Sequence, residues 1–255
     1  MQNCTLLNLK LGSNPKSTNK MFRQVYNRLV AALTLFTIEL IIVWAIFLIC
    51  IIVFLYLSSA ILAGGELGID QAAFNFAKDI ANPTFSSFIE FITFFASRHF
   101  LTPAALLLVG YFLFIRKHRW YSLKVPVVAL GSITLNVVLK YFFDRPRPMM
   151  PLVDASGLSF PSGHSMVAAS FYGLLIYLVW HNVKNVAWRN ALIAFLVVFV
   201  FFIGFSRIYL RVHYATDVMA GFAAGFLWVV IGIGTLRRIE RFSKKEIDPV
   251  VEEEV

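Results

Sequence analysis

Charged residues and cysteines are both scarce in this sequence. Charged residues occupy 15% of its 255 positions, whereas hydrophobic residues occupy 59% and the mean hydropathy is +0.74. A chain with this composition is outside the soluble class and belongs in a bilayer. The two cysteines, Cys4 in a polar segment and Cys50 in an apolar run, lie in different environments, so we expect free thiols and no disulfide.

The opening segment also has few features of a cleavable secretory leader, and we expect it to be a cytoplasmic tail. The opening segment is polar and basic, and it lacks the apolar core and the small-residue cleavage site of a signal peptide. Acidic residues are few, with 14 against 23 basic residues and a net charge of +9. Because the basic residues flank apolar stretches and no groove-binding module lies between them, the charge indicates membrane topology and no nucleic-acid partner.

Six apolar stretches approach the roughly 20 helical residues that cross a hydrocarbon core of about 30 Å. They are residues 36–62, 101–115, 125–143, 165–180, 191–205 and 218–236. Between the first two, residues 72–80 and 85–95 have amphipathic helical spacing broken at Asn82-Pro83, which predicts interfacial helices. A seventh span through 85–95 is the alternative, but Glu90 interrupts it. We therefore expect an all-α, polytopic membrane bundle with six transmembrane helices.

The distribution of Lys and Arg predicts the orientation of these spans. With the N-terminus inside, 16 of the 23 basic residues fall on the cytoplasmic side, in agreement with the positive-inside rule. We expect a multi-pass protein of the cell membrane with both termini in the cytoplasm: a polar tail at 1–30, a membrane domain at 31–240 and a charged tail at 241–255. The remaining basic residues face outward, and they are Lys78, Arg98, Lys140, Arg145, Arg147, Arg207 and Arg211.

Most of these outward basic residues fall in two short stretches, 140–147 and 207–211, at the ends of spans. A charge at a membrane boundary is costly unless it is solvated or paired, so the clustering indicates an anionic ligand. A third stretch, Pro161-Ser162-Gly163-His164, opens the fourth span at the same surface. Its free helical amides can bind an anion, although an ordinary helix cap has the same pattern.

A histidine and an aspartate follow the fifth span. His213 and Asp217 are four residues apart, so on one helix they share a face and the carboxylate can hold the imidazole in one tautomer. Such a pair on its own is also common as a structural contact. Its chemical meaning therefore depends on the other two stretches.

Together, the three stretches resemble the type 2 phosphatidic acid phosphatase superfamily, in its membrane lipid phosphatase branch. The resemblance rests on Lys140, six residues, Arg147-Pro148; on Pro161-Ser162-Gly163-His164; and on Ser206-Arg207, five residues, His213, three residues, Asp217. Chance agreement at so many specified positions in order is negligible. The resemblance implies a membrane-embedded hydrolase of lipid phosphate esters or anhydrides with its active site on the extracytoplasmic face.

The same resemblance implies the roles of the motif residues. His213 becomes the nucleophile that forms a phosphohistidine, Asp217 orients it, and His164 acts as the general acid. The phosphate-binding residues are Lys140, Arg147, Ser162, Gly163 and Arg207. We expect no cofactor and no metal ion. Lysine and arginine side chains can offset the negative charge of the phosphate, and the carboxylates on the outer side are not spaced in the sequence as metal ligands usually are.

Two other readings remain for the chain as a whole. The haloperoxidase branch of the superfamily uses the same cradle for vanadate, but those proteins are soluble. A transporter or channel also places charges at helix ends, although paired interrupted helices in two halves are then typical.

Four further residues lie outside the motif positions. Arg145 and Arg211 could bind a second phosphate or a lipid headgroup, or could pair with Asp144 or Asp154. Arg98 and His99 are weaker candidates of the same kind.

The expected partners are a lipid phosphate substrate and the surrounding membrane lipids, without an indication of oligomeric state. An outer-leaflet lipid such as undecaprenyl pyrophosphate, phosphatidylglycerol phosphate, phosphatidic acid or lipid A fits the predicted position of the site. The arginine-rich third motif favours the polyprenyl diphosphate or the phosphatidylglycerol phosphate.

Overall fold

The computed structural model describes residues 15–64, 67–149 and 151–247, and all regular structure in these ranges is helical. The helices are α1 (Pro15–Leu62), α2 (Gly68–Asp79), α3 (Pro83–Phe94), α4 (Arg98–Gly110), a π-helical segment (Tyr111–Ile115), α5 (Arg119–Phe143), α6 (Gly163–Asn182), α7 (Val186–Tyr209), α8 (Ala215–Phe242) and a second π-helical segment (Ser243–Ile247). Cys50 is a free thiol, as expected. Cys4, residues 1–14 of the expected N-terminal tail and residues 248–255 of the expected C-terminal tail lie outside the described residues, whereas 15–30 belong to α1 and 241–247 are helical.

The chain divides into two compact units, Met1–Ile46 and Phe47–Val255. The described part of the first unit is helical and belongs to α1, and its side chains Ile41 and Trp44 are exposed. The second unit contains the rest of α1 and all the other helices. All three sequence motifs therefore lie in the second unit.

Six stretches of the described residues are long and apolar enough to cross a membrane, as the sequence predicted. They are Leu40–Leu62, Pro83–Ile115, Arg119–Phe143, Gly163–Asn182, Val186–Tyr209 and Ala215–Lys245. The second one begins earlier than expected, because α3 is apolar enough to be counted with α4. At 1.5 Å per residue, α4 and the π-helical segment after it already extend about 27 Å, close to the hydrocarbon thickness, without α3.

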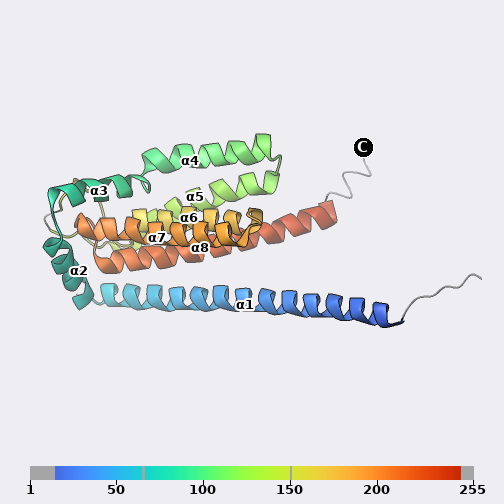
Figure 1. Cartoon of the computed structure of the whole chain (residues 1–255). Helices are drawn as coiled ribbons and strands as arrows, with labels where there is room; N and C mark the ends of the chain where they lie inside the picture. The colour runs from blue at the N-terminus through green and yellow to red at the C-terminus, as the bar shows by residue number, and fades with distance from the viewer. Residues whose placement is uncertain (1–14, 65–66, 150, 248–255) are drawn as a thin grey trace, which may run out of the picture. The chain divides into compact units, whose positions relative to one another are not determined.

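Helix α6 lies at the centre of the second unit, where it packs against α5, α7 and α8 (Figure 1). Its buried residue Leu174 joins a cluster with Val125, Val128 and Val229 of the neighbouring helices. Another cluster connects α6 to α4 and α7. This packing fixes the start of α6, where the Pro-Ser-Gly-His motif lies.

Two glycines of α8 allow it to approach α6 closely. A Cβ atom on Gly221 would lie 2.7 Å from the carbonyl oxygen of Ser162, and one on Gly225 would lie 2.4 Å from that of Met166. Small residues of this kind let two membrane helices bring their backbones together. The start of α8 is thereby held against the start of α6.

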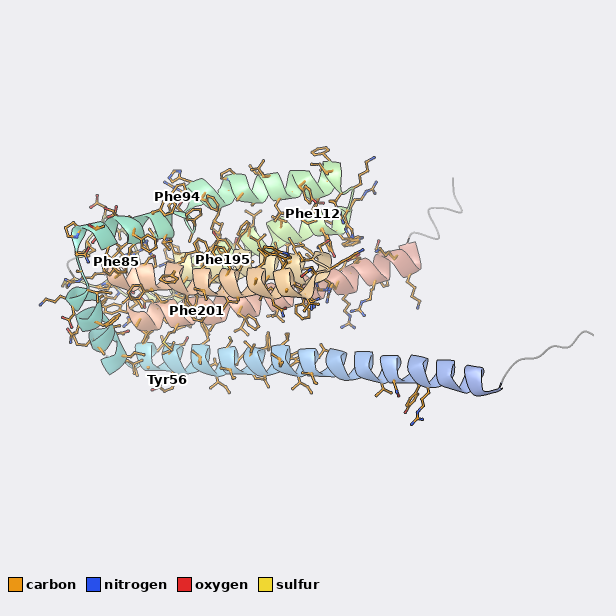
Figure 2. The ribbon with its side chains drawn as sticks, in the orientation of Figure 1. Tyr56, Phe85, Phe94, Phe112, Phe195 and Phe201 are labelled. Carbon is orange, nitrogen blue, oxygen red and sulfur yellow. The ribbon has the colours of Figure 1, made fainter. Side chains whose placement is uncertain are left out.

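Large apolar side chains also cover the outside of the second unit. Tyr56, Phe94, Phe195 and Phe201, which Figure 2 labels, are all exposed. In water such a surface would be costly, whereas lipid tails accept it without penalty. Phe112, by contrast, is buried between helices.

Helices α2 and α3 cover the end of the bundle at which α7 stops and α8 starts (Figure 1). The corner between them is set by Asn82, whose side chain caps α3 by accepting from the Phe85 amide at 2.9 Å, while Pro83 occupies the first turn. The hydroxyl of Tyr209 on α7 meets Ser86 Oγ at 2.9 Å and the Asn82 amide at 3.3 Å. The corner is therefore tied to the end of α7.

Candidate active site

The three motifs meet at one end of the bundle. Lys140 lies in the last turn of α5, Arg207 in the last turn of α7, and Asp217 in the first turn of α8. The Pro-Ser-Gly-His motif opens α6, and Arg147 and His213 lie in the connecting segments. These helix ends lie beside α2 and α3 in Figure 1.

His213 is held between a carboxylate and a guanidinium. Its Nδ1 lies 3.3 Å from Asp217 Oδ2, and its Nε2 lies 3.4 Å from Arg147 NH1. A guanidinium only donates, so Nε2 must be the acceptor and the ring proton must lie on Nδ1, facing the carboxylate. This tautomer leaves the Nε2 lone pair directed toward the basic side chains.

The His213–Asp217 contact arises differently from the shared helix face that the spacing suggested. Helix α8 begins at Ala215, so His213 precedes its cap residue, Tyr214. Asp217 reaches back as the third helical residue, and its Oδ2 accepts from the Tyr214 amide at 3.0 Å as well as meeting His213. The helix cap therefore orients the Asp217 carboxylate.

Burial controls the charge of His213, whose side chain is 2% exposed. Desolvation lowers its pKa from 6.5 to about 4; the hydrogen bond that its Nδ1 donates to Asp217 and the negative charge of that carboxylate oppose this shift, while the Arg147 and Lys140 charges add to it. Burial also lowers the pKa of Arg147, which stays far above neutrality for a guanidinium. At neutral pH, His213 is thus an uncharged imidazole facing cations.

Arg147 and Lys140 are fixed by backbone carbonyl oxygens of the segment between the first two motifs and of the segment after α7. Arg147 Nε donates to Ser156 O and Gly157 O at 3.1 and 3.0 Å, and its NH1 donates to Val212 O at 2.8 Å. Lys140 Nζ donates to Leu158 O. Neither cation is neutralised by these oxygens, so both keep a net charge to offer to an anion.

The start of α6 provides main-chain donors and a second histidine. The Ser162 hydroxyl accepts from the Ser165 amide at 3.5 Å as the helix cap, and the Ser162 amide donates to Asp217 O at 3.0 Å. Ser162 thus joins α6 to α8, while the first-turn amides at Gly163 and His164 have no carbonyl of their own helix to meet. The charges of Lys140, Arg147, Arg207 and His213 all act on His164, which lies among them.

Arg207 is 7% exposed and is held from α3. Its NH1 donates to Thr93 Oγ1 at 2.7 Å, and within the described part of the chain its buried Nε has no hydrogen-bond partner. A buried guanidinium donor without a partner is costly unless an acceptor arrives. Its neighbour Arg147 is close enough for the two positive charges to repel, so the pair suits an oxyanion.

Arg145 has partners that were not expected from the sequence. It forms ion pairs with Asp217 at 2.6 Å and with Asp70 of α2 at 3.1 Å, instead of with Asp144 or Asp154. The sequence did not indicate Asp70 or Thr93 as site residues, because both lie outside the motifs. For Asp70, the available signal was its place as an acidic residue in the first turn of an amphipathic helix. Arg98 and His99 lie exposed in the first turn of α4.

Within residues 15–64, 67–149 and 151–247, no group of three His, Cys, Asp or Glu side chains is arranged to hold a metal ion. The charged side chains that converge are instead mainly cationic. What the arrangement offers is a neutral imidazole beside a cradle of lysine, arginines and helix amides. This combination suits attack on a phosphorus atom that carries several negative oxygens.

Comparisons with known proteins identify relatives of this chain. The model of the PAP2 superfamily matches residues 121–240. Phosphatidylglycerophosphatase B of Bacillus subtilis is 33% identical over 194 residues, which cover 75% of this chain and 95% of that protein. Undecaprenyl-diphosphatase BcrC of the same organism is 29% identical over 161 residues, which cover 59% of this chain and 74% of that protein.

A solved structure has the same architecture. The crystal structure of the transmembrane PAP2 type phosphatidylglycerolphosphate phosphatase from Bacillus subtilis superposes with a TM-score of 0.69 at 33% identity, covering 77% of this chain and 98% of that one. Fold, site and relatives together define a multi-pass membrane enzyme that removes phosphate from lipids. The chain belongs to the PAP2 superfamily.

Proposed function

We propose that this enzyme hydrolyses a lipid phosphate ester or diphosphate through a phosphohistidine on His213. One observation carries the proposal: the His213 ring lies between Asp217 and Arg147, with its proton toward the carboxylate and its lone pair toward the cations. A transporter or channel needs no such orientation of an imidazole, and family membership also favours the enzyme.

In the first step, the Nε2 lone pair of His213 attacks the terminal phosphorus while the bond from that phosphorus to the leaving oxygen breaks; this oxygen is the lipid alkoxide of a monoester or the bridging oxygen of a diphosphate, which leaves with the lipid monophosphate. The ring becomes cationic, and the Asp217 carboxylate at Nδ1 stabilises that charge. His164 gives its proton to the departing oxygen. Because the bound phosphate brings negative charge among Lys140, Arg147 and Arg207, substrate binding favours the protonated form of His164.

In the second step, His164 takes a proton from water, and the resulting hydroxide attacks phosphorus. The bond from nitrogen to phosphorus breaks, inorganic phosphate leaves, and His213 returns to its neutral form. Throughout both steps, the non-bridging oxygens are met by Lys140, Arg147, Arg207 and the amides at the start of α6. These donors are held by the protein before substrate arrives, so they need little rearrangement.

The substrate proposal follows the relatives and the charge of the site. One relative is named for phosphatidylglycerol phosphate and another for undecaprenyl diphosphate. Lys140, Arg147 and Arg207 converge around His164, so three basic side chains face the negative charge of either headgroup. We assign the natural substrate to these two lipid phosphates ahead of phosphatidic acid and lipid A.

The active site is assigned to the extracytoplasmic surface. This side follows from the positive-inside tally, in which the basic residues between the second and third spans and after the last span are cytoplasmic. An even number of spans is consistent with this assignment, in which both termini are cytoplasmic and the motifs lie on the other side. An outer-leaflet lipid reaches the site without crossing the membrane.

Trapping the intermediate tests the proposed chemistry. Rapid quenching of the wild-type enzyme with ³²P-labelled phosphatidylglycerol phosphate or undecaprenyl diphosphate should give an acid-labile, base-stable phosphoprotein. The His213→Gln variant should give none. A phosphohistidine that persists in that variant refutes the nucleophile assignment, and the absence of phosphate release from every lipid phosphate offered to wild-type enzyme refutes the proposed function.

A further inference from the structure

Asp70 connects an interfacial helix to the catalytic pair. It lies in the first turn of α2 and is 6% exposed. Its Oδ1 accepts from the Thr216 amide at 2.9 Å, and its Oδ2 accepts from Thr216 Oγ1 at 2.9 Å and from Arg145 NH2 at 3.1 Å. Asp70 therefore contacts Thr216, the residue directly before Asp217, and Arg145, the charge partner of Asp217.

Arg145 is shared between the two carboxylates. Its NH1 donates to Asp217 Oδ1 at 2.6 Å and to Thr216 Oγ1 at 2.8 Å, while its NH2 faces Asp70. The guanidinium plane also lies over the ring of Tyr214, with its carbon 3.9 Å from the centroid. Arg145 is therefore held from two sides and cannot turn toward a substrate without breaking both ion pairs.

The balance of charge explains why a second carboxylate is present. Asp217 must stabilise a cation on His213, yet its other oxygen already carries the Arg145 guanidinium, which offsets its negative charge. Asp70 pairs with that guanidinium and returns the cluster to one net negative charge. Asp70, His213 and Asp217 are buried, so such a charge acts strongly on its neighbours.

Building on the proposed function, we propose that Asp70 is a positioning residue for catalysis: through Arg145 and Thr216 it aligns Asp217 and keeps the carboxylate able to stabilise the cationic His213. Asp70 itself does not touch substrate. Its contacts reach His213 only through Arg145, Thr216 and Asp217.

A purely structural role for Asp70 would be to cap α8. The Thr216 amide is one of the first-turn amides of α8, and Asp70 Oδ1 accepts from it. Asparagine keeps an acceptor oxygen of the same shape at this position and removes only the charge. Asp70→Asn therefore separates the cap from the proposed electrostatic role.

The experiment uses the full-length enzyme in detergent and a set of charge variants. Relative to wild type, Asp70→Asn makes the cluster one unit more positive, Arg145→Gln makes it one unit more negative, and the double variant restores the net charge. Asp79→Asn is the matched control, because Asp79 is an exposed residue at the other end of α2. Folding is checked by gel filtration and by the melting temperature.

We expect Asp70→Asn to lower kcat at least about tenfold, the effect of one pKa unit of charge stabilisation, with little change in KM. The double variant should have a higher kcat than Asp70→Asn alone, and Asp79→Asn should match wild type. ¹⁵N NMR of the labelled histidine rings should show the lowest His213 pKa in Asp70→Asn and the highest in Arg145→Gln. The other charged or titratable groups facing His213, namely Lys140, Arg147, His164 and Asp217, are unchanged in all variants.

Two results overturn the positioning role. One is a folded Asp70→Asn enzyme with unchanged kcat and an unchanged His213 pKa; the other is a double variant with a lower kcat than either single variant. If Asp70→Asn does not fold, the test is the comparison of Arg145→Gln with wild type. The proposal then requires a higher pKa of the His213 ring in Arg145→Gln than in wild type. A wild-type enzyme that forms no phosphohistidine refutes the proposed function instead, whatever the variants do.

Discussion

Gly221 lies so close to Ser162 that a Cβ atom on the glycine would be 2.7 Å from the serine carbonyl oxygen. This approach joins the α8 helix that carries Asp217 to the α6 helix that carries His164. The distance is shorter than real Cβ contacts, and the atom in the way is backbone, which cannot rotate aside. The relative placement of α6 and α8 therefore depends on the absence of a side chain at Gly221.

Gly221→Ala should accordingly separate the helix starts and lower both activity and stability. Overpacking of this kind costs about 1–3 kcal/mol, and a shift of less than 1 Å at the reacting groups is enough to slow catalysis. Gly234→Ala in the same helix is the control, because nothing lies within 4 Å of its added Cβ and alanine favours a helix. Equal kcat and melting temperature in the two variants would contradict this account.

His164→Ala should affect substrates unequally. A lipid alkoxide is a poor leaving group and needs the proton of His164, so its hydrolysis should fall about 10²–10⁴-fold. p-Nitrophenyl phosphate, whose leaving group needs little protonation, should lose far less. The ratio of kcat values on the two substrates measures this difference, and identical losses on both would remove His164 from the role of general acid.

His213 should stay neutral with its proton on Nδ1 down to pH values well below its ordinary pKa of 6.5. Its pKa is about 4 in the folded protein, so between pH 6.5 and 4 the unfolded chain binds more protons at this site. The contribution of His213 to stability therefore falls as the pH is lowered through this window. ¹⁵N ring shifts of labelled histidine, assigned with His213→Gln, report the titration; a midpoint at or above pH 6.5 would show that burial does not control this ring.

Activity should persist in EDTA, because the phosphate charge is met by Lys140, Arg147, Arg207 and helix amides in place of a divalent ion. Phosphate release from a lipid phosphate in detergent is measured before and after chelation. Vanadate should inhibit the same preparation, since it adopts the five-coordinate geometry of phosphorus during transfer. Complete loss in EDTA that one metal ion restores would contradict the cradle.

The proposed sidedness can be tested with thiol labelling in intact cells, or in spheroplasts where an outer membrane is present. Ser156 is exposed in the segment between the first two motifs, and unlike Gly157, which has φ 77°, it accepts a side chain without strain. With Cys50 replaced by alanine, an impermeant maleimide should label Ser156→Cys and miss Cys4. Labelling of Cys4 together with protection of position 156 would place the site on the cytoplasmic side.

The sequence predicted the spans and the motifs well because both are local patterns. Apolar length marks the six crossings, and the motif residues such as His213 and Asp217 are close together in the chain. Asp70 and Thr93 could not be found this way, since they reach Arg145 and Arg207 across 75 and 114 positions and nothing in their own neighbourhood shows it. The sequence also did not predict that α8 begins at Ala215, after His213. The cap that brings Asp217 close to His213 depends on side-chain geometry, which the spacing alone does not give.

The contact between Asp70 and Thr216 has a consequence for biosynthesis. The two residues are separated by 146 positions, which a ribosome adding about 5–20 residues per second makes in roughly 7 to 30 s. During that time α2 has been translated, but Thr216, whose amide and hydroxyl donate to Asp70, has not. The nascent chain thus holds Asp70 without these two hydrogen-bond donors, and under the proposed mechanism it should begin to dephosphorylate lipids only once its last long helix, with Asp217, has been added.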